Sequence, residues 1–276
     1  MMHRQINLNL RTGYLAYFLI AVGFSWLFWI PAALAGENIL ESAWVILLYI
    51  GGAGPAIGGI ALTVLNKDKE SRQEYWRRVW DIKRISGKWY LLILLAYPLI
   101  TVLLGMAENK QPQLTETFKE LLSQPVRLIP FAVFIFIFGP LPEELGWRGY
   151  ALDGLQRRTN AVTASLLLGV VWAVWHIPLF FMQGTYQYEL GFGSAAFWRF
   201  MVFAVVISIF FTWIYNNNQR SILSAALFHF SVNFTGNVFE VTEKLELQRI
   251  LLFALMAVVV VVLYGAKDLV RKPKVT

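Results

Sequence analysis

The sequence predicts an all-α, multi-pass integral membrane protein with about eight transmembrane helices in one bundle. Hydrophobic residues make up 57% of the 276 residues and aromatic residues 16%, which is more than a soluble domain of this size carries. Eight apolar segments reach the roughly 20 residues that a membrane-spanning helix needs. The alternation of period two that a membrane β-barrel requires is missing.

The apolar segments follow one another along the chain with mostly short connections. They lie near 13–36, 42–66, 88–107, 127–146, 160–183, 194–215, 220–239 and 248–268. The fourth and the seventh also carry polar residues. Because we find no internal repeat and no low-complexity stretch, residues 1–276 are predicted to form a single membrane-embedded domain.

Lysine and arginine predict the orientation. With an even number of spans and a cytoplasmic N-terminus, seventeen of these residues fall on the cytoplasmic side and six on the other, with Arg148 set aside. Cytoplasmic loops carry such an excess, so we expect both termini in the cytoplasm, in the plasma membrane if the protein is prokaryotic. The net charge of +7 then reflects a basic cytoplasmic face in contact with membrane lipid, and no nucleic-acid partner is predicted.

The longest basic connection, residues 67–87, mixes basic residues with five large side chains: Tyr75, Trp76, Val79, Trp80 and Ile82. This pattern is typical of a short helix in the membrane interface. A solvated basic loop with aromatic anchors would show the same residue pattern. Neither interpretation implies catalysis.

Two absences narrow the function classes. The chain has no cysteine, which excludes disulfides, thiolate nucleophiles and metals held by sulfur. The first apolar segment is too long for a cleaved signal peptide and lacks a small-residue cleavage site.

Charged residues follow directly on the apolar run 131–138, in the sequence Gly-Pro-Leu-Pro-Glu-Glu-Leu-Gly-Trp-Arg-Gly. Charge at membrane depth is costly and usually marks a functional site. Pro142 followed by two acids predicts that a helix starts or restarts here. Glu144 and Arg148 stand four apart and can pair on one face. Glu143 points about 100° away, so a structural ion pair leaves this carboxylate unexplained.

Two of the three histidines lie inside apolar segments: His176 and His229, whereas His3 in the tail is incidental. A single histidine on an apolar helix is more often a satisfied core group than a catalyst. Asn233 shares a helix face with His229 because the two are four apart. Together with the acidic motif they favour one shared site, since polar residues within lipid face each other or a water-filled cavity.

Helix register predicts that Glu143 and His176 lie at similar depth, because they are about equally far from the turn 157–160 on antiparallel helices rising ~1.5 Å per residue. By the same rise, His229 lies ~13 Å beyond Arg220. To match that depth, the hairpin from residue 148 to 160 must protrude into the cytosol. Its polar residues allow this: Asp153, Gln156, Arg157 and Arg158.

These side chains suffice for peptide hydrolysis without a covalent intermediate. A carboxylate and an imidazole facing one cavity can remove a proton from a shared water. A second imidazole and an amide can donate hydrogen bonds to a developing oxyanion. Pro178 would loosen the fifth segment beside the site.

Zinc is the alternative. Two histidines and a carboxylate, namely Glu143, His176 and His229, form a plausible open ligand set. The sequence lacks the His-Glu-x-x-His pair that would make zinc the default. We favour an arrangement that requires no cofactor.

Three motifs in this order resemble the CAAX prenyl endopeptidase type II and bacteriocin-processing (CPBP, also called Abi) family of intramembrane proteases. They lie within a core at about 127–240, which is about half of the chain. Trp172 stands where the family usually has phenylalanine. The motifs are Glu-Glu-x-x-x-Arg at Glu143, Glu144 and Arg148, aromatic-x-x-x-His at Trp172 and His176, and His-x-x-x-Asn at His229 and Asn233.

The resemblance implies a bundle of eight helices with a conical catalytic cavity open to the cytosol and to lipid. It implies that Glu143 and His176 activate water, and that His229 and Asn233 form the oxyanion hole. Glu144 and Arg148 would position the cluster, with Trp172 as an aromatic wall.

The implied substrate is a peptide or the prenylated C-terminus of a CAAX protein, which loses its last three residues. Bacteriocin-type peptides are the alternative substrates. Two other hypotheses stay open. The chain could be a non-catalytic immunity or scaffold protein that keeps the protease fold, or a proton-coupled transporter, for which the paired broken helices of two repeats are missing.

Overall fold

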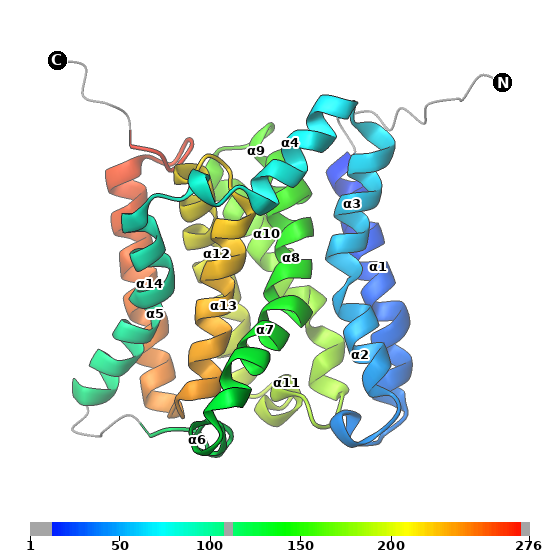
Figure 1. Cartoon of the computed structure of the whole chain (residues 1–276), viewed down its shortest axis with the longest axis vertical. Coiled ribbons are helices and arrows are strands. Elements are labelled where there is room, and N and C mark those ends of the chain that lie inside the picture. Colours follow the sequence, from blue (N-terminus) through cyan, green and yellow to red (C-terminus); the bar gives the residue numbers. More distant parts are fainter. Residues whose placement is uncertain (1–12, 108–112, 272–276) are drawn as a thin grey trace.

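A computed structural model describes residues 13–107 and 113–271. Within these ranges the chain forms one bundle of helices (Figure 1), with a single isolated β-bridge between Leu114 and Phe239. His3 and five basic residues used to predict the orientation lie outside the described residues: Arg4, Arg11, Lys110, Lys272 and Lys274.

Seven segments are long and apolar enough to cross a membrane, and the protein is an integral membrane protein. The spans are α1 (Gly13–Leu34), α2 with α3 (Val45–Gly52 and Gly54–Asn66), α5 (Gly87–Ala107), the stretch Pro125–Gln156, α10 with the 3₁₀ turn η5 (Ala161–Trp175 and Ile177–Phe181), α12 (Ala195–Asn217) and α14 (Glu243–Tyr264). They confirm seven of the eight predicted segments.

The remaining predicted segment, 220–239, forms α13 (Ile222–Val238), a helix of 17 residues. At 1.5 Å per residue it is about 25 Å long, less than the hydrocarbon thickness. It packs against α5, α8 and α12, so neighbouring helices rather than lipid surround much of it. That position tolerates the polar side chains that α13 carries, namely Ser224, His229, Ser231, Asn233, Thr235 and Asn237.

The stretch Pro125–Gln156 is not one continuous helix. The 3₁₀ turn η3 (Pro125–Arg127) precedes α7 (Leu128–Phe138). The chain then bends at Gly139, where φ is −132° and ψ is −90°. A new helix, α8 (Pro140–Gly146), begins there with proline in its first turn and is followed by the π-helical segment η4 (Trp147–Ala151) and by α9 (Leu152–Gln156). The predicted restart of a helix before Glu143 is therefore confirmed.

Close contact between α3 and α8 depends on glycine. A Cβ on Gly59 would lie 2.9 Å from Gly146 Cα, and a Cβ on Gly146 would overlap Pro55 O. Small residues let the backbones of membrane helices approach. This contact fixes α8 against α3, directly behind the acidic pair.

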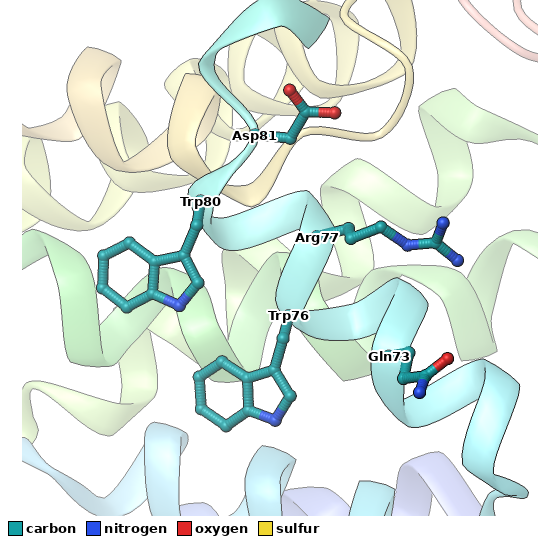
Figure 2. A pocket seen from close by; sticks show the side chains of 5 residues that line it. All are labelled: Gln73, Trp76, Arg77, Trp80 and Asp81. Atoms are coloured by element: carbon teal, nitrogen blue, oxygen red, sulfur yellow. The ribbon is translucent and has the colours of Figure 1, made fainter.

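Residues 69–80 form α4 (Lys69–Trp80), which crosses one end of the bundle (Figure 1). Asp68 caps the helix by accepting a hydrogen bond from Ser71 N at 2.7 Å. Tyr75 and Val79 are buried, whereas Trp76 and Trp80 are exposed and line a shallow groove on the outer face with Gln73, Arg77 and Asp81 (Figure 2). Of the two interpretations of residues 67–87, the structure supports the amphipathic helix.

The other short helices and turns lie between these elements. They are η1 (Ile39–Glu41), η2 (Ile82–Arg84), α6 (Glu116–Ser123) and α11 (Tyr186–Leu190). Helices α6 and α11 lie at the end of the bundle opposite α4 (Figure 1).

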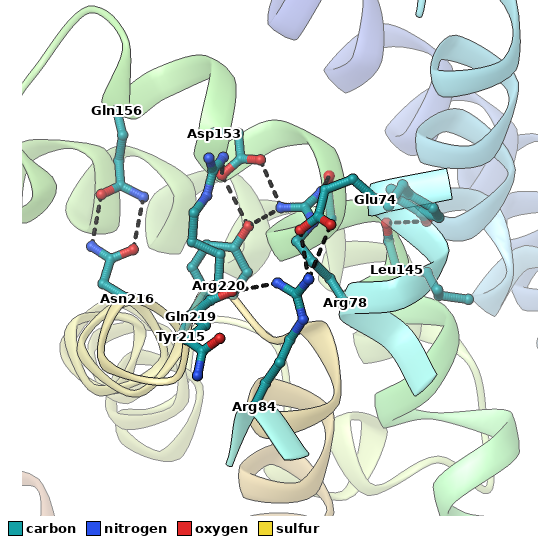
Figure 3. Close-up of polar contacts among 12 residues, drawn as sticks. Glu74, Arg78, Arg84, Leu145, Asp153, Gln156, Tyr215, Asn216, Gln219 and Arg220 are labelled. Atoms are coloured by element: carbon teal, nitrogen blue, oxygen red, sulfur yellow. Dashed lines mark hydrogen bonds and ion pairs between the residues drawn. The ribbon is translucent and has the colours of Figure 1, made fainter. Parts of the chain in front are cut away.

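A buried ionic cluster, here called the α4 clamp, joins α4 to the bundle (Figure 3). Asp153 of α9 accepts hydrogen bonds from Arg78 Nη1 and Tyr215 Oη, both at 2.9 Å, and pairs with Arg220. Arg78 Nη2 also donates to Gly149 O at 3.1 Å. Asp153 is 5% exposed. The predicted protruding hairpin is therefore wrong at Asp153, because the carboxylate is buried by partners from distant parts of the sequence.

Candidate active site

The acidic motif lies where α8 enters the core of the bundle. Glu143 is 8% exposed and Glu144 fully buried. The bend at Gly139 puts both in the first turns of a new helix, where acidic side chains complement the helix dipole. The two carboxylates point to different neighbours, as their separation of one residue predicts.

Glu144 belongs to an ion-paired network. Its Oε1 accepts from Arg148 Nη1 at 2.9 Å, which confirms the predicted pair, and it lies 3.0 Å from His229 Nδ1. The Arg148 guanidinium also lies 4.1 Å from the ring centroid of Phe211, and its Nη2 donates to Ser208 at 3.3 Å. This network links α8, η4, α12 and α13 through one buried carboxylate.

Glu143 is held differently. Its Oε2 accepts a hydrogen bond from Trp172 Nε1 at 2.7 Å, and the carboxylate lines a cavity. Trp172 was predicted only as an aromatic wall. The indole N–H is a further functional feature, and the one signal for it in the sequence is the tryptophan at a position where phenylalanine is usual, because tryptophan alone adds a donor.

His176 follows the last residue of α10, and its ring is fixed by its own helix. Nδ1 lies 2.8 Å from Trp172 O, one turn earlier. Pro178 falls in the first turn of η5, so α10 ends beside the site, as predicted from the missing backbone donor. Trp175 and Phe200 pack edge-on against the imidazole.

A cavity of about 630 Å³ brings the predicted residues together. Its wall includes Glu143, Trp172, His176, His229 and Asn233, which come from three helices. Asn233 lies near the bend of the acidic segment, since a Cβ on Gly139 would be 3.7 Å from Asn233 Nδ2. Glu144 and Arg148 stay behind the wall. Trp172, predicted as a supporting residue with Glu144 and Arg148, differs from them because it lines the cavity.

The cavity reaches the surface away from α4. Its exposed lining residues include Gly236, Asn237 and Glu240, where α13 ends, and Phe138 on α7. The start of α1 and the end of α14 lie at the opposite end of the bundle, with α4 (Figure 1). The sequence predicted cytoplasmic termini together with a site reached from the cytoplasm. Asn237 and Glu240 form a polar rim of the cavity. The structure puts the described chain ends and this polar rim at opposite ends of the bundle.

The arrangement of the possible ligands bears on the zinc alternative. Across residues 13–107 and 113–271, no group of three histidine, aspartate or glutamate side chains is placed to hold a metal ion. The Nδ1 atoms of His176 and His229 are engaged with Trp172 O and Glu144. The alternative ligand set of Glu143, His176 and His229 would have to use the two Nε2 atoms.

The fold and the site define an integral membrane protein with a buried carboxylate, two histidines and an asparagine around one cavity. Comparison with known proteins shows what the chain is similar to. Residues 125–235 match the model of the type II CAAX prenyl endopeptidase Rce1-like family. The chain is also 28% identical to CAAX prenyl protease 2 of Methanococcus maripaludis over 265 residues, covering 93% of this chain and 95% of that protein. The chain is thus similar to CAAX prenyl endopeptidases over the residues that carry the motifs, and this similarity supports a peptidase.

Proposed function

We propose that the protein hydrolyses a peptide bond with a water activated by Glu143 and His176, without a required metal, and that it removes the last three residues of prenylated CAAX-type C-termini. The observation that supports this most is the cavity itself. Its lining includes a carboxylate, two imidazoles and an amide that belong to apolar segments of the chain. Such a cluster is costly and is retained for function.

The contact of His176 favours a role as a base. A backbone carbonyl can only accept a hydrogen bond, so the contact with Trp172 O assigns the proton to Nδ1. In the neutral ring, Nε2 is then unprotonated. It can take a proton from a water that Glu143 also contacts, which is general-base activation.

The contact of His229 favours a role as a donor. Glu143 and Glu144 carry two negative charges when ionised, and Arg148 supplies one positive charge. A protonated His229 beside Glu144 would balance the cluster. Its Nδ1 would donate to Glu144 and its Nε2 to the developing oxyanion, next to the amide of Asn233.

The wall of the cavity between α2 and α7 suits a prenyl chain. Leu48 and Tyr49 on one helix face Ile135 and Phe138 on the other, and the rings of Tyr49 and Phe138 are 5.1 Å apart. Phe138 is 48% exposed, so this wall continues into the lipid-facing surface. A lipidated peptide could keep its prenyl group in lipid while its backbone reaches Glu143.

A cleavage assay tests the proposal. The purified protein in lipid vesicles is incubated with a farnesylated CAAX peptide and with the same peptide unmodified, each with and without a zinc chelator, and products are identified by mass spectrometry. We expect release of a C-terminal tripeptide from the farnesylated peptide, unchanged by the chelator. Loss of activity with chelator would establish the zinc alternative. Equal cleavage of the unmodified peptide would remove the prenyl group from the substrate definition.

We place the α4 end in the cytosol, because basic residues gather there. In that orientation the polar rim lies on the other side of the membrane, so the prenylated substrate reaches Glu143 through the lipid-facing wall between α2 and α7. The chain has no cysteine, so single cysteines at Lys83 and Glu240 can be labelled with an impermeant maleimide in intact cells and in inverted vesicles. We expect Lys83→Cys to react in inverted vesicles only. Reaction of Glu240→Cys there instead would reverse the topology.

A further inference from the structure

A second charged group lies in the cavity, far from the acidic motif in sequence. Arg249, in the second turn of α14, is 7% exposed and lines the same cavity as Glu143 and His176. Its guanidinium stacks near two aromatic rings, with Cζ 5.3 Å from the centroids of both Tyr97 and Phe203. A buried charge of this kind normally has an anionic partner.

Within the described residues, Arg249 has no such partner. No side chain or carbonyl there accepts a hydrogen bond from its guanidinium, and its buried Nε is without a partner. The neighbouring carboxylate, Glu246, is already held by Arg199 Nε at 2.6 Å. Glu243, also near, pairs with Arg199 at 3.4 Å and is largely exposed. Among the described residues that line the cavity, Arg249 is therefore a cation with at least its Nε donor unused.

We propose that Arg249 binds the free α-carboxylate of the substrate and so sets which peptide bond lies at Glu143. The inference rests on the proposed function, because it takes the substrate to be the C-terminus of a chain. Guanidinium matches a carboxylate with two parallel hydrogen bonds, which makes arginine the preferred residue for this recognition. The rings of Tyr97 and Phe203 contact the Arg249 guanidinium and keep it oriented.

The span from His176 to Arg249 fits a leaving group of three residues. The His176 ring lies 5.2 Å from that of Phe200, and Phe203 is one turn further along α12. With Arg249 5.3 Å beyond Phe203, this path of side chains puts the guanidinium at most about 16 Å from His176. An extended tripeptide spans about 10 Å, and a hydrogen bond at each end adds about 3 Å. A tripeptide leaving group is therefore long enough to join the two groups.

Equilibrium binding tests whether Arg249 binds the substrate carboxylate, without relying on cleavage. A fluorescent farnesylated CAAX peptide is prepared as the free acid and as the C-terminal carboxamide, and its Kd is measured for the wild type, Arg249→Gln and Arg249→Lys in detergent micelles. We expect the wild type to bind the acid roughly 10- to 100-fold more tightly than the amide, as for one charged hydrogen-bonded pair. Arg249→Gln should lose this preference without weaker binding of the amide, and Arg249→Lys should keep part of it.

Arg127→Gln is the matched control, because Arg127 is exposed at the same end of the bundle and does not line the cavity. It removes the same charge and should keep the acid preference. An equal preference in the wild type and in Arg249→Gln would overturn the anchor, as would the lack of any preference in the wild type. Cleavage is followed by mass spectrometry on the same wild-type samples. A wild type that prefers the acid but releases no tripeptide would contradict the proposed function and leave the carboxylate site intact.

Discussion

The α4 clamp and the cavity site are both buried ionic clusters, yet their hydrogen bonding differs. In the clamp both oxygens of Asp153 are occupied, by Arg78 on one side and by Tyr215 and Arg220 on the other. Burial lowers the pKa of Arg78, but Tyr215 and Asp153 together hold the pKa above its ordinary value. In the cavity, Glu143 has one oxygen bonded to Trp172, and the carboxylate faces an empty space of substrate size.

This difference distinguishes a cluster that stabilises the fold from one that can take part in a reaction. In the clamp the carboxylate has no free oxygen left for a substrate, and removing one member leaves the others unneutralised. A cluster with unused donors and acceptors facing a cavity can bind and react, but adds less to stability. Mutations should therefore affect stability in one region and turnover in the other.

The largest effect on turnover is expected for His176→Ala. General acid–base groups contribute typically 10²–10⁴-fold, so cleavage should fall by about 10³-fold per folded molecule. The melting temperature should fall only modestly, because the imidazole makes a single hydrogen bond to its own helix and packs edge-on against Trp175 and Phe200. Cleavage of the farnesylated peptide and a thermal melt check this. Retained cleavage would exclude His176 as the base.

Asp153→Asn should have the largest effect on stability, about 3–5 kcal/mol, because it leaves Arg78 and Arg220 without the buried carboxylate. Unfolding in detergent measures the loss. Asp68→Asn is the control, since Asp68 is an exposed helix cap and asparagine caps about as well. Equal stability of the two variants would show that the clamp contributes nothing.

Asn233→Ala should reduce turnover by about 10²–10³-fold, the usual cost of losing one oxyanion donor. Binding of the peptide should change little, because the donor acts on the charge of the transition state. A rise in KM with unchanged kcat would instead show that Asn233 binds the substrate in its ground state.

Tyr75→Phe should have the smallest effect. Tyr75 Oη donates to Leu145 O at 2.8 Å, next to the acidic pair, and the loss of one such bond costs about 1 kcal/mol. Tyr90→Phe is the control, because its hydroxyl donates to Ile82 O in an exposed position. A fall in turnover without a fall in stability would show that α4 positions the catalytic helix.

Many features of the fold and of the cavity site could be predicted from local sequence. Apolar length predicted the spans, the spacing of four predicted the Glu144–Arg148 pair, and the polar residues within apolar segments predicted one shared site. These inferences depend on helix geometry, which acts over a few residues.

Long-range partners were not predictable. The burial of Asp153 depends on Arg78 and Tyr215, 75 and 62 residues away. The bond from Trp172 to Glu143 spans 29 residues, and Arg249 enters the cavity from a helix outside the motifs. The sequence also could not show at which end the cavity opens, because that depends on how α13, α6 and α14 meet.

The most direct test compares Glu143→Gln with Asp153→Asn in one preparation, by cleavage of the farnesylated peptide per folded molecule and by thermal unfolding. Both replace a buried carboxylate by its nearly isosteric amide. We predict that Glu143→Gln lowers cleavage by about 10³-fold, as His176→Ala does, and keeps the wild-type melting temperature, while Asp153→Asn lowers the melting temperature and keeps turnover within a few-fold. Wild-type cleavage by Glu143→Gln would contradict the assignment of this carboxylate as the group that activates water.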